Sequence, residues 1–574
     1  STYDSWSRPR YDEEKDFNKL DENGVRIPLT DGQKTLLAER QGTYSFSPSR
    51  GERTTAQLLG NYQWDINDNW NLNFFLGGEY SESRSYSANM GGYNFLLGGD
   101  FYSLNNVDPS YLTLGSGSYQ LAMTHTKRNK YGFFGEIRGD YKGMIQLSVT
   151  GRIDGSSTLK QCDSSYFYPS FTGGIVFSEL FGWHNDWFSF GKIRGNYAKV
   201  GKDAPANQFS DNYKQWPTFP DGGFGINPIY GVANWLEPEM TKSWEIGTDL
   251  RFFNSRTRLD LAYYSTTVDN QIVTVRVSPA SGQILQTRNE GSIENYGVEL
   301  TASQDILTTK DFQWTANVNF SFNRGRVRSL PSEVSEIQGG QYGDVFCSAY
   351  LNESTTALSG TDYQRAPDGQ ILVDENGYPL ISPNKQNYVG NREPDFLLGL
   401  GSTFTWKDLS LSFLFDGRKG GDVLNYTGRS LFSSGQSEYL SKYRNREYVF
   451  NGVVANGDGT YRPNTNKVII DQQFINNYFY NVSSNFIEDG SYIRLSYVTL
   501  AYDFGRLMRK LGSKNPIKGL KASVTGRNLF LWTKYTGADP QVMPTAANGT
   551  GAMGIDQFSV PSLRSVNFNV NVTF

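Results

Sequence analysis

Apolar and polar residues alternate strictly at the end of the chain. In SVNFNVNVTF (565–574) every second residue from Val566 onward is valine or phenylalanine, and the residues between them are asparagine or threonine. A period of two residues places the apolar set on one face of a β-strand and the amides on the other. Asparagine is a poor strand residue in general, so the pattern indicates a strand that separates two very different environments.

The same alternation recurs along the chain. NWNLNFFLGGEY (69–80), TANVNFSFN (315–323) and DLSLSFLFDG (408–417) carry aromatic or aliphatic residues on one face and mainly amide, hydroxyl or acidic residues on the other. A soluble sandwich gives short strands with turn signals every 8–12 residues. Longer strands with one hydrocarbon-like face and one polar face are typical of a transmembrane antiparallel β-barrel, and this all-β fold is predicted here.

The lengths of the connections give a second indication. Fifteen strands are predicted, at 54–65, 69–82, 129–141, 144–154, 168–178, 188–199, 241–253, 257–268, 293–305, 312–323, 395–406, 409–418, 491–504, 519–529 and 563–574. Short links such as INDN and WKD alternate with long ones, at 83–128, 200–240, 324–394, 419–490 and 530–562. Outer-membrane barrels have short periplasmic turns and long outer loops. The parity therefore predicts a periplasmic C-terminus, an external segment at 1–53 and barrel from 54 to 574.

Fifteen strands do not make a finished barrel. Bacterial barrels normally close with an even number of strands, and an open sheet edge in lipid leaves backbone groups unsatisfied at several kcal/mol each. The first predicted strand runs downward from an external segment, so at least one upward strand is expected before it. We therefore expect something else to complete the wall.

Composition agrees with a membrane setting built from strands. Aromatic residues make up 15% of the 574 residues, with 36 Tyr and 37 Phe, while the mean hydropathy is −0.52. No stretch approaches the roughly 20 apolar residues that a transmembrane helix needs. The net charge of −4 argues against nucleic acid as a partner. Ser1 is not a start methionine, so a processed or partial chain is expected.

Several motifs resemble those of the SusC/RagA-like TonB-dependent transporters. SVTGRIDGSSTLK (148–160) and YFYPSFTGGIVFSEL (166–180) resemble the paired R-x-D-G-S-S and F-P-S strand motifs of that family. FGKIRGNYAKVGKD (190–203) resembles its K-x-R-x-S-Y-G-x-x-G segment, with Asn196 and Ala198 as variants. Further motifs follow in the family's order, at 241–273, 289–303, 390–425, 489–504 and 526–542.

The resemblance implies more than periodicity shows. Members of this family form 22-stranded barrels in the outer membrane of Bacteroidota, with an N-terminal plug that bears a TonB-contacting segment. A SusD-like surface lipoprotein closes the outer mouth, and the proteins import oligosaccharides or oligopeptides with energy transmitted by the TonB complex. In this sequence the plug, the TonB segment and the early strands are not found. We therefore expect a plug-bearing N-terminal segment or a second polypeptide to supply them.

Enzymatic, metal and redox chemistry find little support in the sequence. His125 and His184 are the only histidines, and neither lies in a nucleophile–base or zinc-ligand arrangement. The segments at 367–379 and 455–466 carry Asp and Asn near Gly, but turn formation explains them as well as calcium does. Cys162 and Cys347 lie far apart and set no disulfide framework. We expect no enzymatic activity, no metal and no cofactor.

Two sets of residues are candidates for contact with substrate or plug. The loop at 214–235 holds aromatic rings among Pro and Gly, which suit sugar faces, peptides or a partner's apolar patch as well as packing within the loop. These rings are Trp216, Phe219, Phe224, Tyr230 and Trp235. Arg494 falls opposite the face of Ile493, Leu495 and Tyr497, so it is predicted to point into the lumen, toward a plug carboxylate or passing substrate.

Other aromatics near strand ends are predicted to form girdles at the membrane–water interface, in contact with outer-membrane lipid. They are Trp70, Trp406, Trp532 and Tyr535.

Three functions remain open from the sequence. The first is nutrient import through a plugged barrel with a SusD-like lid. The second is a barrel of the same family that serves as a structural subunit of a larger outer-membrane assembly. The third, a secreted glycan-binding β-protein, is disfavoured because the alternating apolar sets would lie exposed to water.

Overall fold

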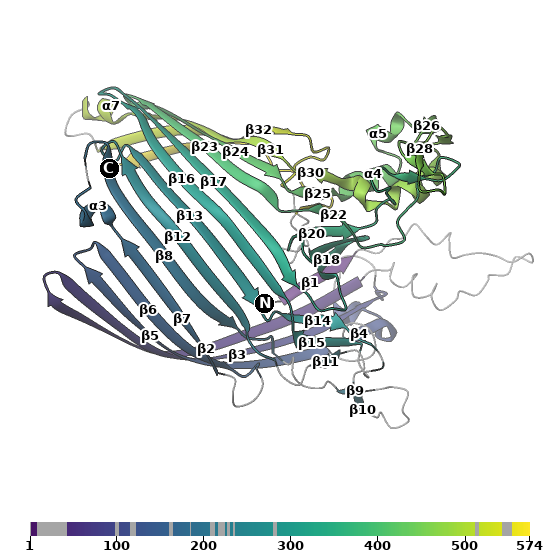
Figure 1. Cartoon of the computed structure of the whole chain (residues 1–574), viewed down its shortest axis with the longest axis horizontal. Coiled ribbons are helices and arrows are strands. Elements are labelled where there is room, and N and C mark those ends of the chain that lie inside the picture. The colour runs from purple at the N-terminus through teal and green to yellow at the C-terminus, as the bar shows by residue number, and fades with distance from the viewer. Residues whose placement is uncertain are drawn as a thin grey trace, which may run out of the picture.

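The computed structural model describes residues 2–7, 43–97, 103–114, 122–159, 165–183, 185–206, 213–215, 224–226, 230–232, 236–278, 280, 284–510, 516–541 and 554–574. One large antiparallel sheet dominates this part of the chain (Figure 1). Its strands are β1 (Thr2–Ser7), β2 (Thr43–Asn67), β3 (Trp70–Tyr93), β4 (Leu112–Leu114), β5 (Ala122–Tyr141), β6 (Ile145–Ser156), β7 (Ser165–Ile175), β8 (Phe188–Lys202), β12 (Glu239–Phe252), β13 (Thr257–Asp269), β16 (Ser292–Thr308), β17 (Phe312–Ser329), β23 (Pro394–Trp406), β24 (Leu409–Gly420), β31 (Tyr492–Asp503), β32 (Gly519–Thr533) and β34 (Ser565–Thr573).

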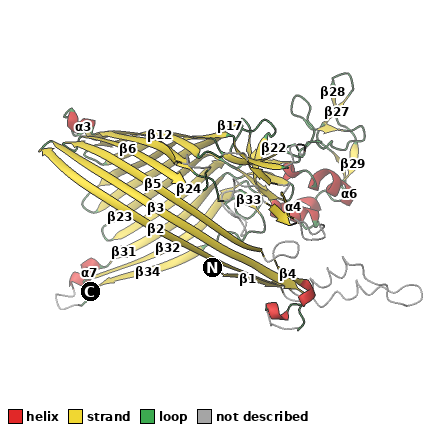
Figure 2. Cartoon of the chain, turned by 90° about the horizontal axis from the view of Figure 1, so that it is seen from below, coloured by secondary structure: helices red, strands yellow, loops and turns green. Residues whose placement is uncertain are grey.

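Neighbouring long strands pair in chain order, and the sheet curves into an open trough (Figures 1 and 2). Within the described residues no strand pairs with the outer edge of β34, and β1 covers only the first residues of β2. The sheet is therefore not closed into a barrel. Each of the fifteen segments predicted from the sequence is a long strand of this sheet.

The pairing register of the strands aligns apolar residues with apolar residues and polar residues with polar residues. One row across the sheet joins Leu261, Leu300, Phe320 and Leu398, while the adjacent row joins Asp260, Thr301, Asn319, Gly399 and Asp416. The apolar side chains thus lie on one face and the polar side chains on the other. Large apolar residues on the first face, such as Phe133, Leu76 and Phe568, are 63–78% exposed. The apolar sets do not meet in a shared dry core.

The two ends of the trough differ. At one end tight turns join the strands. In the β5–β6 turn three residues separate Tyr141 from its partner Ile145, and Lys142 and Gly143 have φ values of 55° and 70°, the left-handed conformation that tight hairpin turns use. The short helices α3 (Phe177–Leu180) and α7 (Gly505–Lys510) lie at this end, near the C-terminus (Figure 1). None of the helices in the described ranges is long and apolar enough to cross a membrane.

At the other end the long connections fold into small sheets and helical turns (Figure 2). Their strands are β9 (Tyr213–Gln215), β10 (Phe224–Ile226), β11 (Tyr230–Val232), β14 (Ile272–Arg276), β15 (Leu285–Asn289), β18 (Glu336–Tyr342), β19 (Val345–Tyr350), β20 (Ala357–Gly360), β21 (Leu372–Val373), β22 (Asn387–Asn391), β25 (Asp422–Asn425), β26 (Glu447–Val449), β27 (Val453–Ala455), β28 (Tyr461–Pro463), β29 (Lys467–Ile469), β30 (Ile487–Asp489) and β33 (Ile555–Asp556). Their helical turns are η2 (Leu104–Asn106), η3 (Pro109–Tyr111), α4 (Tyr426–Ser433), α5 (Glu438–Ser441), α6 (Gln472–Phe474), η5 (Ile475–Tyr480) and η6 (Ser483–Phe486).

We call the part formed by residues 336–391, 422–489 and 554–556 the loop body. The larger of the two buried apolar clusters of the described chain lies here, around Val345, Leu358, Leu424, Phe432 and Ile555. The long excursions expected at 324–394, 419–490 and 530–562 each contribute described residues to this one packed unit. The trough itself contributes little to this core, because its apolar residues lie on its outer face.

The two largest differences from the predicted boundaries are in β2 and β3. β2 begins at Thr43 and pairs with β1, so the segment 1–53 is not wholly an external loop. β3 continues to Tyr93, about ten residues into the loop predicted at 83–128. Between Ser49 and Arg53 of β2 and between Ser83 and Ser85 of β3 both faces are polar, which interrupts the period-two signal on which the prediction depended.

Candidate functional site

The polar, inner face of the trough is the natural candidate for a transport path. Its charged residues form ion pairs with one another, both across the sheet and along a single strand. Arg194 of β8 donates to both carboxylate oxygens of Asp260 on β13, at 3.0 and 2.9 Å, and lies 3.7 Å from Glu245 on β12, the strand between them. On β6, Arg152 donates to Asp154 at 2.7 Å, and Tyr168 also donates to that carboxylate. The inner wall therefore presents mainly amides, hydroxyls and neutralised ion pairs.

A buried ion pair lies where the inner wall meets the loop end. Arg494 of β31 donates to Asp539 at 2.7 Å, and their side chains are only 7% and 4% exposed. Asp539 belongs to the segment after β32, and its carboxylate also accepts the backbone N–H of Gln541 at 2.9 Å. This segment is thereby held against the inner face of β31. The arginine side chain lies on the inner side, next to a carboxylate of its own chain.

The surrounding contacts extend this clamp. Gln541 donates to the hydroxyl of Tyr492, which donates to Asp416 at 3.2 Å. Arg418 donates to the carbonyl oxygens of Gly490, at 2.8 and 3.0 Å, and of Pro540, at 3.3 Å. We call Asp416, Arg418, Tyr492, Arg494, Asp539 and Gln541 the rim clamp. A β-bulge after Leu495 places Tyr497 opposite Leu414 on the inner row, so the predicted grouping of Tyr497 with Ile493 and Leu495 is wrong.

The loop body holds a second buried arginine. Arg429 on α4 pairs with Asp344 and donates to the carbonyl oxygen of Tyr480 at 2.8 and 3.1 Å. Burial alone would raise the pKa of Asp344, but the Arg429 guanidinium outweighs it and holds that pKa below its ordinary value. The pair ties the start of the loop body to its later helices, and the sequence analysis missed it.

Tyr535 corrects one prediction. It was expected in an interfacial girdle, but it is 5% exposed and its hydroxyl donates to Asp556 at 2.7 Å. Burial and the neighbouring Asp556 carboxylate raise the pKa of this hydroxyl. The chain turns inward after Thr533, so a residue only two positions beyond the strand end lies inside the protein.

The other predicted girdle residues lie on the exposed face. Trp70, at the start of β3, is 45% exposed, Trp406, at the end of β23, is 58% exposed, and Trp532, near the end of β32, is 52% exposed. Trp70 and Trp406 flank tight turns, and Trp532 lies near the loop end. The three therefore occupy both ends of the trough, as an interfacial role requires.

The predicted aromatic loop falls mostly outside the described residues. This holds for Trp216, Phe219 and Trp235, while Phe224 in β10 and Tyr230 in β11 are described by their backbone only. β11 runs parallel to β15, with Tyr230 opposite Leu285. The role of the five rings in binding stays a prediction.

Other candidate chemistry is accounted for by local structure. His125 stacks on Tyr86 with ring centroids 4.4 Å apart, and His184 lies outside the described residues. Cys347 is free and buried, and Cys162 is also outside them. In the suggested calcium segments, Asp374 and Asp458 accept backbone N–H groups of their own turns. No group of three or more potential His, Cys, Asp or Glu ligands occurs in the described chain.

A buried carboxylate, Asp203, directly follows β8 at the end of the trough where the long connections lie, within the motif at 190–203. Asp203 is 5% exposed and accepts hydrogen bonds from Arg128, Lys130, Ser156 and Thr158. These partners come from β5, from the end of β6 and from the turn that follows it. Burial alone would raise the pKa of Asp203, but Arg128, Lys130 and Ser156 outweigh it and hold that pKa well below its ordinary range.

Replacing Asp203 with asparagine should destabilise the fold by about 2–3 kcal/mol, because two partly buried cations lose their partner. Since the folded-state pKa lies below the ordinary value of 3.8, the aspartate's contribution is present above about pH 4 and is lost as the pH falls below it. Asp269→Asn, which breaks a half-exposed pair with Lys242, is the matched control and should cost only about 0.5 kcal/mol. Heat- and pH-dependent unfolding of the full-length protein in detergent checks both values, and equal losses would contradict the assignment.

The comparisons with known proteins agree with this architecture. The family model described as "TonB dependent receptor-like, beta-barrel" matches residues 2–529. The chain belongs to this family. It is 28% identical over 512 residues to TonB-dependent receptor P26 of Formosa agariphila, covering 83% of this chain and 48% of that protein. It is 24% identical over 456 residues to TonB-dependent receptor SusC of Bacteroides thetaiotaomicron, covering 73% of this chain and 42% of that protein.

Among solved structures, the fold is similar to that of the RagAB peptide transporter. The TM-score is 0.70 at 18% identity, and the match covers 93% of this chain and 56% of that one. The resemblance to SusC/RagA-like transporters that the motifs indicated is thus confirmed. Family members are outer-membrane β-barrels, and these relatives are receptors and transporters, not enzymes. The chain spans about half the length of the curated relatives it matches.

Proposed function

We propose that this chain is the barrel part of a TonB-dependent importer of oligosaccharides or oligopeptides that works with a SusD-like surface lipoprotein. The observation that carries the proposal is the division of one sheet into an exposed apolar face and an amide- and hydroxyl-rich inner face. A wall of this kind suits a large polar solute that must pass between hydrocarbon on the outside and a wet interior. Membership of the TonB-dependent receptor family supports the same function.

The loop body faces outward in this proposal, and the tight turns and the C-terminus face the periplasm. The support is the segregation of long connections at one end of the trough (Figure 1), because outer-membrane barrels have short periplasmic turns and long outer loops. The loop body would then meet the lipoprotein, and the aromatic residues at 214–235 would contact substrate or that partner. Trp70, Trp406 and Trp532 would anchor the wall in the two interfaces.

Further strands would close the wall between β34 and β2, and a plug would fill it and contact the TonB complex. In the part of the chain that the structure describes, the edge of β34 and the edge of β2 beyond Pro48 have no partner strand, and this supports closure, because unpaired backbone groups are costly in hydrocarbon. The plug-bearing part belongs either to the same polypeptide or to a second one. Its carboxylates and cations would face the neutralised ion pairs of the inner wall.

Uptake by whole cells tests import directly. Cells that carry the full-length protein should accumulate a fluorescently labelled oligosaccharide or oligopeptide mixture, and collapse of the proton gradient should reduce uptake to the level of a strain that lacks the gene. Surface binding at 4 °C serves as the control, since it needs no energy. If neither mixture is taken up while the protein is folded and abundant, and its removal instead disrupts a larger assembly, the structural-subunit function would replace import.

A further inference from the structure

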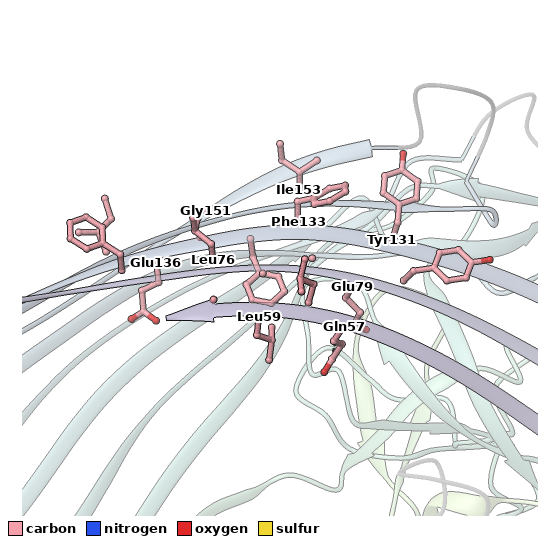
Figure 3. A pocket seen from close by; sticks show the side chains of 18 of the residues that line it. Gln57, Leu59, Leu76, Glu79, Tyr131, Phe133, Glu136, Gly151 and Ile153 are labelled. Carbon is pink, nitrogen blue, oxygen red and sulfur yellow. Dashed lines mark hydrogen bonds between the residues drawn. The ribbon is translucent and has the colours of Figure 1, made fainter. Parts of the chain in front are cut away.

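The exposed face of the trough carries an apolar hollow of about 1490 Å³, over β2, β3, β5, β6 and β7. Figure 3 shows Phe133, Ile153 and Tyr131 on one side of the sheet, while Gln57 and Glu136 point to the other. Leu58, Leu76, Phe133 and Phe167 rise around the hollow and are 57–82% exposed. The hollow is therefore on the face that meets hydrocarbon in an outer-membrane barrel.

Glycines make the floor of the hollow. Two neighbouring rows cross the strands on this face: one runs from Leu58 through Gly78 and Phe133 to Ile153, and the other runs from Gly60 through Leu76 and Gly135 to Gly151. A Cβ at Gly60 would have only a backbone oxygen near it, at 4.0 Å, whereas a Cβ at Gly78, Gly135 or Gly151 would meet the side chain of Phe133, Leu76 or Phe167 at 2.9–3.3 Å. The hollow is thus open above Gly60 and is bounded by these large side chains.

Aromatic residues border the hollow toward the loop end. Tyr80 and Tyr131 face each other across β3 and β5 and are 45% and 42% exposed. Tyrosines at this position suit the boundary between hydrocarbon and headgroups.

Cations follow on the same face beyond the tyrosines. Arg84 pairs in register with Lys127 and lies next to Glu52 of β2, and Arg50 is one position further along β2 on this face. Lys127 is four positions from Tyr131, which is about 13 Å along the strand and about 10 Å along the membrane normal once the strand tilt is included.

These cations are only partly neutralised by neighbouring carboxylates. Glu82 forms ion pairs with Arg84 and Lys127, and Glu52 forms an ion pair with Arg50. Three cations face two carboxylates, and the cations' side chains are 43–78% exposed. N–H donors and one surplus positive charge therefore remain at headgroup height.

We propose that this face binds a single anionic membrane lipid, with an acyl chain in the hollow and its phosphate at Arg84, Lys127 and Arg50. The two parts match a lipid in order and in polarity: hydrocarbon below, an aromatic boundary, and cations above. A second protein would not need apolar, aromatic and cationic surfaces in this order along the membrane normal. A phosphate also binds exposed arginine and lysine side chains more strongly than a neutral protein surface does. The inference needs only the membrane setting of the family, not the proposed import.

Binding measured by native mass spectrometry on the full-length protein in detergent tests the proposal. The probes are dioleoyl phosphatidylglycerol, dioleoylglycerol, which lacks the phosphate, and glycerol phosphate, which lacks the chains. Only the complete lipid should bind tightly. Arg84→Ala with Lys127→Ala should weaken its binding about 25-fold, since each cation near a phosphate is worth roughly a factor of five. Lys242→Ala, which removes an outward cation on β12, should leave the affinity unchanged.

Filling the hollow separates the two parts of the site. Gly60→Leu should displace the acyl chain and weaken binding at least tenfold, whereas Gly139→Leu, on the same face of β5 but outside the hollow, should not. Equal binding of dioleoylglycerol would overturn the role of the cations, and unchanged binding by Gly60→Leu would overturn the role of the hollow. A bound second copy of the chain that lipid cannot displace would overturn both. The comparison of the three probes on the unaltered protein holds even if a variant fails to fold.

Discussion

Replacing Val318 with arginine should destabilise the folded protein in the membrane by about 2–4 kcal/mol, the cost of a cation at the middle of a lipid-facing strand. Val318 lies on the apolar face of β17, opposite Ala302 and Leu400. It is midway between Phe312, beside a tight turn, and Phe322, the last outward aromatic of this strand. An arginine at this depth has no short path to either interface.

Asn319→Arg is the matched control, because it changes the adjacent residue to the same side chain on the opposite face. Asn319 lies in the inner row between Thr301 and Gly399, where water or polar side chains solvate the cation, so its effect should stay below about 1 kcal/mol. The fraction of each variant that migrates as the folded, heat-modifiable form after extraction from outer membranes measures the difference. Equal loss for both variants would show that the two faces do not meet different solvents.

The strands of the trough could be predicted because contact with lipid restricts which residue types can occupy alternate positions of a strand. Wherever one face meets hydrocarbon, residues such as Leu409, Leu411 and Phe413 must alternate with polar ones, and every segment with this signal is a strand. The signal disappears where both faces are polar. The stretch of β2 from Ser49 to Arg53, with Arg50 and Glu52, is a strand all the same, held by pairing with β3 and not by a pattern of its own.

The loop body could not be predicted in this way. Its stability depends on buried pairs whose members are far apart in sequence, such as Arg429 with Asp344. Neither residue carries a local sign of its partner, and a charged residue in a long connection is ordinarily solvated. The prediction for Tyr535 fails for a related reason. Its position near the strand end suggested the membrane interface, whereas only the folded chain shows that its hydroxyl donates to Asp556. The inward direction of Arg494 followed from alternation, but its partner did not.

Removing the charge of Asp539 should release the segment 534–541 from the inner wall. Asp539→Asn keeps an oxygen for the backbone N–H of Gln541 but leaves the Arg494 guanidinium buried without its carboxylate, and Arg418 and Arg494 both lie within 5.5 Å of the Tyr492 ring centroid. Breaking a buried ion pair in this way costs about 3–5 kcal/mol. Amide hydrogen exchange of residues 534–541 should therefore become at least about a hundredfold faster, since each 1.4 kcal/mol is a factor of ten. Exchange in β17 should stay the same.

A second variant separates the charge from the shape of the rim clamp. Arg494→Leu combined with Asp539→Leu removes both charges and fills the space with apolar groups, which is often neutral or stabilising for a buried pair. The double variant should thus restore most of the protection that Asp539→Asn loses, and Arg494→Leu alone should lose it, because Asp539 then stays buried without a cation. If all three variants exchange like the unaltered protein, the ion pair does not hold the segment, and the hydrogen bonds from the Arg418 side chain to the Pro540 carbonyl and from Thr536 to the Glu488 carboxylate would be its principal attachments.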